Sequence, residues 1–181
     1  MSSANAVAEA FLGGWQFGGI TTVQSGEAVT ATMSSDFSNT GSFSYRPDQI
    51  GNPYDFSLNT GSQGTDFGCT NPGHQNLDCW FNQTVFVTPS LAPGQQFSHQ
   101  YGDARIGNLR GPDLVDFDFV LQKNFKLRES QQLEFRAEFF NIFNHTQFLN
   151  PDGNITDGTD FGRVKRTRDP RNIQFAVKFA F

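Results

Sequence analysis

Apolar and polar residues alternate strictly in several segments of this 181-residue chain, and this alternation constrains its fold more than any other feature. In the last ten residues, Ile173, Phe175, Val177, Phe179 and Phe181 alternate with polar or small residues up to the C-terminus. A period of two is the spacing of side chains on one face of a β-strand. We therefore predict strands over about 13–33, 114–127, 133–143 and 172–181, and an all-β fold.

The segment between the second and third predicted strands is short and polar, which predicts an antiparallel hairpin. Because the apolar faces of paired strands must match, odd-numbered residues must face odd-numbered residues. A five-residue turn from Arg128 to Gln132 satisfies this condition and places Lys126 opposite Glu134, a favourable pair of opposite charges. A slip of two residues would keep the faces matched but would lose this charge pair.

The other connections, residues 34–113 and 144–171, are long. Loops beyond about 15 residues are uncommon in compact soluble domains. Short turns at one end of a sheet and long loops at the other are typical of outer-membrane barrels. We expect the short turn to be periplasmic and both long segments to be extracellular loops. No run of about 18 apolar residues exists, so the sequence excludes a membrane-spanning helix.

Phenylalanine dominates the apolar faces, with 21 residues in the chain. Because aromatic girdles are typical of membrane barrels, we predict antiparallel strands of a transmembrane β-barrel, with lipid on one side and a hydrated lumen on the other. Lys123 shares the apolar face, and either snorkelling to the periplasmic interface or a bulge near Asn124 would accommodate it. The residues expected to face lipid are Phe117, Phe119, Leu121, Phe135, Phe175 and Val177.

Four strands are too few to close a barrel, for which about eight is the practical minimum. An open sheet in lipid would leave backbone groups at its edges without hydrogen bonds, at a cost of several kcal/mol each. We therefore expect this chain to be the C-terminal part of a larger barrel. The N-terminal sequence MSSANAVAEAFLGGW lacks the basic and apolar regions of a signal peptide, which indicates either a cytosolic chain or a beginning further upstream.

Five motifs occur in order along the chain, and together they resemble a known family. The motifs are Phe11-Leu12-Gly13-Gly14-Trp15-Gln16 with Gln24-Ser25-Gly26, then Asn108-Leu109-Arg110-Gly111-Pro112, then FRAEFFNIFNH from Phe135 to His145, then Phe161-Gly162-Arg163, and last Thr167-Arg168-Asp169-Pro170-Arg171 with terminal Phe181. Their order and spacing resemble the C-terminal end of Oar-like TonB-dependent receptors over nearly the whole chain.

The resemblance implies a barrel of about 22 strands with an N-terminal plug in the cell outer membrane. Such a receptor takes up a bound ligand with energy from the inner-membrane TonB complex, without a cofactor. The resemblance also implies that Phe181, with Phe179, belongs to the signal read by the barrel assembly machinery. The plug and the TonB-contacting segment would lie upstream of Met1. We therefore expect TonB contact only through those regions, and no transport by the isolated chain.

The net charge is −5 and the pI about 5.0, which argues against nucleic-acid binding because phosphate contacts need a basic face. Basic residues gather just before the last predicted strand, at Arg163, Lys165, Arg166 and Arg168. At an outer rim these side chains would meet the phosphates of lipopolysaccharide. A solvated loop neutralised by its own acids, such as Asp160 and Asp169, is the alternative.

Cys69 and Cys79 lie in a segment rich in Gly, Asn and Asp, with His74 midway between them. We predict a disulfide between them, which would stabilise the segment by about 2 to 3 kcal/mol and would require an oxidising compartment. Two thiolates and one imidazole are an incomplete zinc set, so a metal site is the weaker interpretation. The third interpretation is that both cysteines are free thiols.

The polar face carries four carboxylates that could supply the paired carboxylates of a glycosidase. They are Asp116, Asp118, Glu134 and Glu138. Basic residues share the same face, so a hydrated lumen of mixed charge explains them better. The segment from Asp152 to Arg163 resembles a calcium-binding loop, but its glycine is one place late and its twelfth position is not Glu. We expect no catalytic site, no metal site and no cofactor.

A secreted β-sandwich binding module for carbohydrate or surface adhesion is the alternative function. Aromatic side chains in the long segment would form its recognition surface. These residues are Phe43, Tyr45, Tyr54, Phe56 and Trp80.

Overall fold

A computed structural model describes residues 11–36, 38–39, 41, 45–58, 74–89, 101–128 and 130–181. The chain divides into two compact units. We call the ranges 1–24, 114–147 and 168–181 the strand unit, and the ranges 25–113 and 148–167 the loop unit. Within the described residues, no helix is long and apolar enough to cross a membrane.

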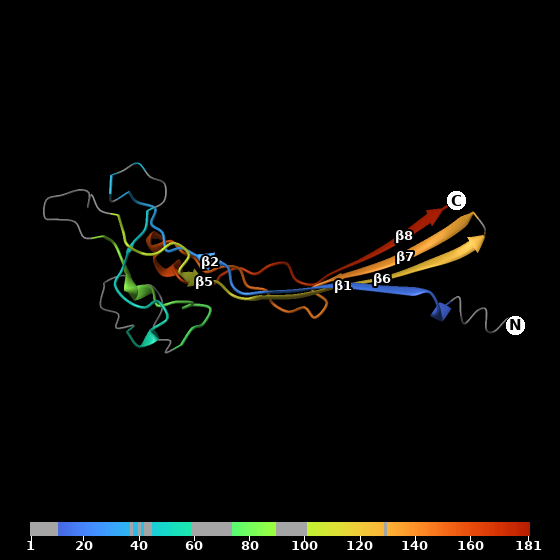
Figure 1. Cartoon of the computed structure of the whole chain (residues 1–181), viewed down its shortest axis with the longest axis horizontal. Helices are drawn as coiled ribbons and strands as arrows, with labels where there is room; N and C mark the ends of the chain where they lie inside the picture. The colour runs from blue at the N-terminus through green and yellow to red at the C-terminus, as the bar shows by residue number, and fades with distance from the viewer. Residues whose placement is uncertain are drawn as a thin grey trace. The chain divides into compact units, whose positions relative to one another are not determined.

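The strand unit is a four-stranded antiparallel sheet in the order β1-β6-β7-β8, with its strands side by side in Figure 1. Its strands are β1 (Trp15–Gln24), β6 (Leu114–Arg128), β7 (Gln131–Phe140) and β8 (Asn172–Ala180). Odd-numbered residues face odd-numbered residues in the main registers, as in Phe119 opposite Phe139 and Phe135 opposite Val177. The predicted antiparallel all-β fold and the matching of apolar faces are confirmed.

The register of the β6–β7 hairpin differs from the predicted one by two residues. Phe125 lies opposite Leu133, and Lys126 lies opposite Gln132 instead of Glu134. The strands continue to Arg128 and from Gln131, with a register shift after Lys126, so the turn is shorter than predicted. The predicted Lys126–Glu134 pair is therefore wrong. Glu134 lies opposite Lys178 of β8, which restores a pair of opposite charges that a two-strand argument could not consider.

The first strand ends at Gln24, whereas the alternation predicts a strand to about residue 33. Gly26 ends it, because its N–H donates to the Asp113 carboxylate at 2.8 Å and its backbone packs against the carbonyl of Gly111. A Cβ atom at this position would lie 1.8 Å from the Gly111 oxygen, so the approach requires glycine. The chain therefore leaves the sheet at Gly26.

The third long strand ends at Phe140 and not at about residue 143. Asn141 adopts a positive φ of 51°, which is incompatible with an extended strand. Its backbone N–H donates to the Asp118 carboxylate of the neighbouring strand at 3.0 Å. The hydrogen bond therefore fixes the strand end.

In its described residues, the loop unit contains two short antiparallel pairs and three short 3-10 helices. The pairs are β2 (Ala28–Val29) with β5 (Leu109–Arg110) and β3 (Asp48–Gln49) with β4 (Phe86–Val87). The helices are η1 (Phe56–Leu58), η2 (Gln83–Val85) and η3 (Ile155–Asp160). The two segments expected to be extracellular loops thus contain regular structure.

The loop unit has a hydrophobic core of its own. Its centre is a cluster of three edge-to-face rings, Phe81, Phe86 and Phe161, with centroid distances between 5.1 and 5.8 Å. All three rings are buried. The rest of the core comprises Val29, Ala31, Met33, Val85, Ala104, Leu109 and Ile155. The segments expected to be extracellular loops therefore contain a packed core, because these residues bury apolar area against one another.

Candidate lipid-facing surface and loop-unit recess

One face of the four-stranded sheet is an apolar surface formed by rows of directly opposed residues. One row contains Phe17, Leu121, Ala137 and Phe175, and the next contains Gly19, Phe119, Phe139 and Ile173. A third row contains Trp15, Lys123, Phe135 and Val177, and Thr21 lies opposite Phe117. All six residues expected to face lipid therefore lie on this face.

The apolar face remains accessible. Phe175 is 69% exposed and Val177 66%, while Phe117, Phe119, Leu121 and Phe135 are half-buried by their cross-strand neighbours. Rings contact each other across the strands, as in Phe17 with Phe119 and Phe135 with Phe175. A contiguous exposed surface of this kind is unfavourable in water and favourable against hydrocarbon.

The opposite face of the sheet carries mixed charges. Arg136 and Glu138 form an ion pair at 2.6 Å, and Glu134 lies opposite Lys178. Asp118 accepts a hydrogen bond from the Asn141 backbone, and Asp116 accepts one from Phe117 N. The carboxylates considered for catalysis thus pair with charges or bond to the backbone. This arrangement suits a hydrated face, where paired charges remain solvated.

Lys123 lies on the apolar face and is only 2% exposed. Its Nζ donates to the Gly13 carbonyl at 2.7 Å and lies 5.0 Å from the centre of the Trp15 ring and 4.9 Å from that of Phe125. The register is regular at this residue, so the alternative of a bulge near Asn124 is wrong. The sheet accommodates the ammonium group by a charge-assisted hydrogen bond and two cation–π contacts.

The end of the sheet opposite the β6–β7 turn is closed by residues 141–147. The Gln147 side chain, which is buried, bonds to both backbone groups of Val115, accepting from its N–H and donating to its carbonyl. Asn141 bonds through its side chain to both the N–H and the carbonyl of His145. These two amide side chains therefore supply hydrogen bonds to the backbone of Val115 and His145 at this end of the sheet.

Comparison with known proteins agrees with this geometry. Residues 1–174 match the family described as outer membrane beta barrel domain. The chain belongs to this family. No curated protein and no solved structure matches it. The barrel domain therefore resides in the outer membrane.

The alternative of a secreted sandwich module does not agree with this assignment or with its aromatic residues. Phe56 is buried, Tyr45 and Trp80 pack against the core of the loop unit, and Tyr54 is exposed. Phe43 lies outside the described residues. The Trp80 indole donates to the Arg110 carbonyl at 2.7 Å, and the Tyr54 hydroxyl accepts from Arg110 N. These rings mainly stabilise the unit and do not form one exposed recognition surface.

The four basic residues expected at the outer rim are divided between the two units of the barrel domain. Arg168 belongs to the strand unit, where its backbone N–H donates to the Gln147 carbonyl. The other three belong to the loop unit, where Arg163 pairs with Asp78 at 2.7 Å and Lys165 with Asp160 at 2.5 Å. The predicted contact set is thus brought together only for Arg163, Lys165 and Arg166.

Cys79 is buried and takes part in a disulfide. Cys69 lies outside the described residues, so its pairing with Cys79 stays a prediction. Among the described residues, no group of three or more His, Cys, Asp or Glu side chains is arranged to hold a metal ion.

An acidic group lies beside the basic residues of the loop unit. Partial desolvation raises the pKa of Asp157 above its ordinary value of 3.8, and the neighbouring carboxylate of Asp152 raises it further. Asn154 donates to the Asp157 carboxylate at 2.8 Å. Asn154 also caps the first turn of η3 by accepting from Thr156 N.

Sequence reasoning missed the roles of Gln147, Asn141 and Gly13. A signal for Asn141 was present in the sequence, because an Asn directly after a strand often bonds to nearby backbone groups, whereas no local pattern indicates Gln147. The contact between Lys123 and Gly13 joins residues 110 positions apart, and no local pattern indicates it.

Proposed function

We propose that this barrel domain is the C-terminal segment of a larger TonB-dependent receptor of the Oar-like type, which takes up a ligand across the outer membrane. The isolated chain supplies barrel strands and loop structure and does not transport by itself. The proposal assigns it no enzymatic reaction, since Glu138 forms an ion pair, Asp116 and Asp118 accept backbone hydrogen bonds, and Glu134 lies opposite Lys178.

The open sheet is the observation that carries the proposal. Among the described residues, β1 pairs only with β6, and β8 pairs only with β7. Each outer strand therefore has one edge of backbone groups without a strand partner, which in lipid costs several kcal/mol per group. Further strands beside both edges would satisfy these groups and close the barrel. The five ordered motifs of the sequence support the receptor assignment.

The end of β8 fits a role in assembly. Phe181 is 93% exposed, and its ring stacks on Phe179 at a centroid distance of 6.0 Å. Figure 1 places the C-terminus at the same end of the sheet as the β6–β7 turn, which we propose to be periplasmic. The barrel assembly machinery would read the two terminal aromatic residues at this end.

The direct test is to read the nucleotides upstream of the Met1 codon for an in-frame continuation and to express the continuous gene with a signal peptide. We expect a product in the outer-membrane fraction whose gel mobility changes on heating. Site-specific cross-linking from the upstream region should capture TonB. A soluble periplasmic product would refute the membrane part, and a membrane product without TonB cross-links would refute the receptor part.

A further inference from the structure

A recess of about 620 Å³ lies in the loop unit between residues 149–153 and residues 163–166. Backbone hydrogen bonds join these two segments, with Leu149 N donating to the Arg166 carbonyl and Asp152 N donating to the Arg163 carbonyl. Pro151 in the first segment and Val164 in the second are buried residues. The recess therefore has a rigid backbone frame and a size in the range of small-molecule sites.

Three cations line the recess: Arg163, Lys165 and Arg166. Two of them are held in place, because Arg163 donates to Asp78 through both Nε and Nη2 and Lys165 donates to Asp160. An arginine that holds one carboxylate still has further N–H donors, and an ammonium group has three donors in all. These side chains are therefore positioned before any ligand arrives, and they keep donors for it.

Arg166 differs from the other two cations. Its side chain is exposed, and the described part of the chain offers it no ion-pair partner. An unpaired guanidinium next to two fixed cations suits a group with several anionic oxygens, since arginine binds phosphate through two parallel hydrogen bonds.

The remaining lining is mixed in character. Asn150 donates to Glu27 through Nδ2 at 2.8 Å, and Asp152 accepts from the backbone N–H of Asn154. Leu149 and Pro151 add an apolar margin. Amide and carboxylate groups beside apolar carbon suit the hydroxyl groups and C–H faces of a sugar.

We propose that this recess binds a phosphorylated saccharide, with the phosphate at Arg166, Arg163 and Lys165 and the sugar against residues 149–152. The role of this ligand at the cell surface rests on the proposed function, because it requires the loop unit to face outside. The phosphate is carried either by the sugars of lipopolysaccharide or by a free sugar phosphate.

The experiment uses the full chain refolded in detergent and measures binding by titration calorimetry. The probes are lipopolysaccharide, the same lipopolysaccharide after phosphatase treatment, glucose 1-phosphate and glucose. We expect at least one phosphorylated probe to bind, and its dephosphorylated counterpart to bind at least about tenfold more weakly. Binding confined to lipopolysaccharide identifies the lipid-borne source, and binding of glucose 1-phosphate identifies a soluble source. Failure of both phosphorylated probes to bind would overturn the proposal.

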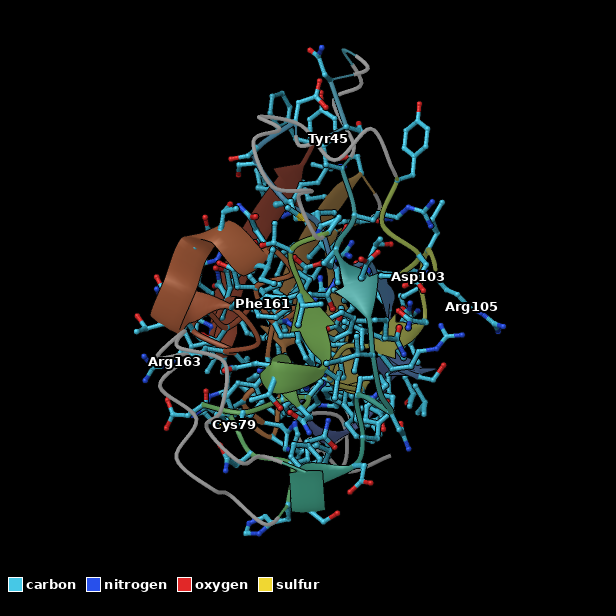
Figure 2. The ribbon with its side chains drawn as sticks, turned by 90° about the vertical axis from the view of Figure 1, so that its left-hand side faces the viewer. Tyr45, Cys79, Asp103, Arg105, Phe161 and Arg163 are labelled. Atoms are coloured by element: carbon cyan, nitrogen blue, oxygen red, sulfur yellow. The ribbon has the colours of Figure 1, made fainter. Side chains whose placement is uncertain are left out.

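Variants test the assignment to the recess. Arg166→Gln removes a cation without breaking an ion pair in the described structure and should weaken binding about tenfold, while Arg166→Lys should restore part of the affinity. Arg105→Gln is the matched control, since Arg105 is exposed and lies on the opposite side of the loop unit from Arg163 in Figure 2. Equal losses in the Arg166→Gln and Arg105→Gln variants would mean a nonspecific charge effect and would overturn the proposal.

The test is independent of the proposed receptor function. Near-ultraviolet circular dichroism, recorded on the same variants, reports whether they fold. If a folded Arg166→Gln variant binds as well as the unmodified chain, the proposed recess site is refuted, and the barrel assignment is unaffected. An Arg166→Gln variant that binds more weakly supports the recess site whether or not TonB is later cross-linked.

Discussion

The ammonium group of Lys123 lies 5.0 Å from the centre of the Trp15 ring, directly opposite it across β1 and β6. The same group donates to the Gly13 carbonyl, and the Trp15 indole donates to the Phe11 carbonyl at 3.0 Å. Cationic and aromatic side chains of this kind gather where a barrel wall meets the lipid headgroups. We infer that this pair marks the periplasmic boundary of the lipid-facing surface.

The strand geometry agrees with that boundary. From Lys123 to Val115 the lipid-facing positions span eight residues of β6, or roughly 26 Å at about 3.3 Å per residue. A strand tilt of about 40° reduces this to roughly 20 Å along the membrane normal, most of the apolar band of about 25 Å that outer-membrane barrels have.

Replacing Lys123 by Met should destabilise the chain in lipid vesicles by about 1 to 2 kcal/mol, because the hydrogen bond to Gly13 and the two ring contacts are lost. Urea unfolding followed by tryptophan fluorescence measures the change. Lys126→Met is the control, since Lys126 is exposed on the polar face and should tolerate the substitution. A more stable Lys123→Met variant would place Lys123 in the hydrocarbon interior, where a lysine costs about 2 to 4 kcal/mol.

Replacing Gln147 by Ala should lower the free energy of unfolding by about 1 to 3 kcal/mol, because both backbone groups of Val115 lose their partner. Hydrogen exchange should show faster exchange of Val115 N–H. Gln132→Ala, at an exposed position on β7, serves as the comparison and should change stability by less than about 0.5 kcal/mol. Unchanged exchange at Val115 in the Gln147→Ala variant would contradict the assigned role.

Replacing Phe161 by Ala should destabilise the loop unit by about 3 to 5 kcal/mol, because the ring packs against both Phe81 and Phe86. Limited proteolysis should then cut within the loop unit at lower protease concentration. The matched variant is Phe143→Ala, whose ring is 71% exposed. If the two variants resist proteolysis equally, the long segments have no packed core.

The carboxyl of Asp157 gives the loop unit a defined response to pH. Its pKa is raised in the folded chain, so its contribution to stability is fully present below the unfolded value of about 3.8 and is lost as pH rises through the raised value. Asp157→Asn should remove this dependence while keeping an acceptor for Asn154. A comparison of thermal unfolding at acidic and neutral pH measures the effect. A pH profile that the substitution leaves unchanged would contradict the assignment.

The sequence predicts the strand unit well for a physical reason. Side chains alternate with a period of two, so Phe117, Phe135 and Phe175 could be assigned to one face without knowing which strands pair. The same period cannot distinguish registers that differ by two residues, which is why the Lys126–Glu134 pair was wrong. The position of Lys123 depends on Gly13 and Trp15, which another strand brings to it.

The loop unit could not be predicted in the same way. Phe81 and Phe161 lie 80 positions apart and pack at a centroid distance of 5.1 Å. Neither residue lies in a segment with periodic hydrophobicity, because both segments are mostly irregular. The recess could not be predicted for the same reason. Its basic residues are neighbours in the sequence, but Asp78, which pairs with Arg163, comes from a distant segment.

The central claim is that the odd-numbered side chains of the sheet face lipid and the even-numbered side chains face water. Its most direct measurement is a nitroxide scan of β8, residues 173–179, in the chain reconstituted in lipid vesicles, with both native cysteines replaced by serine. We predict that labels at 173, 175, 177 and 179 collide more with dissolved oxygen, and labels at 174, 176 and 178 more with a water-soluble nickel chelate. Equal access of both reagents along the strand, without a period of two, would contradict the account.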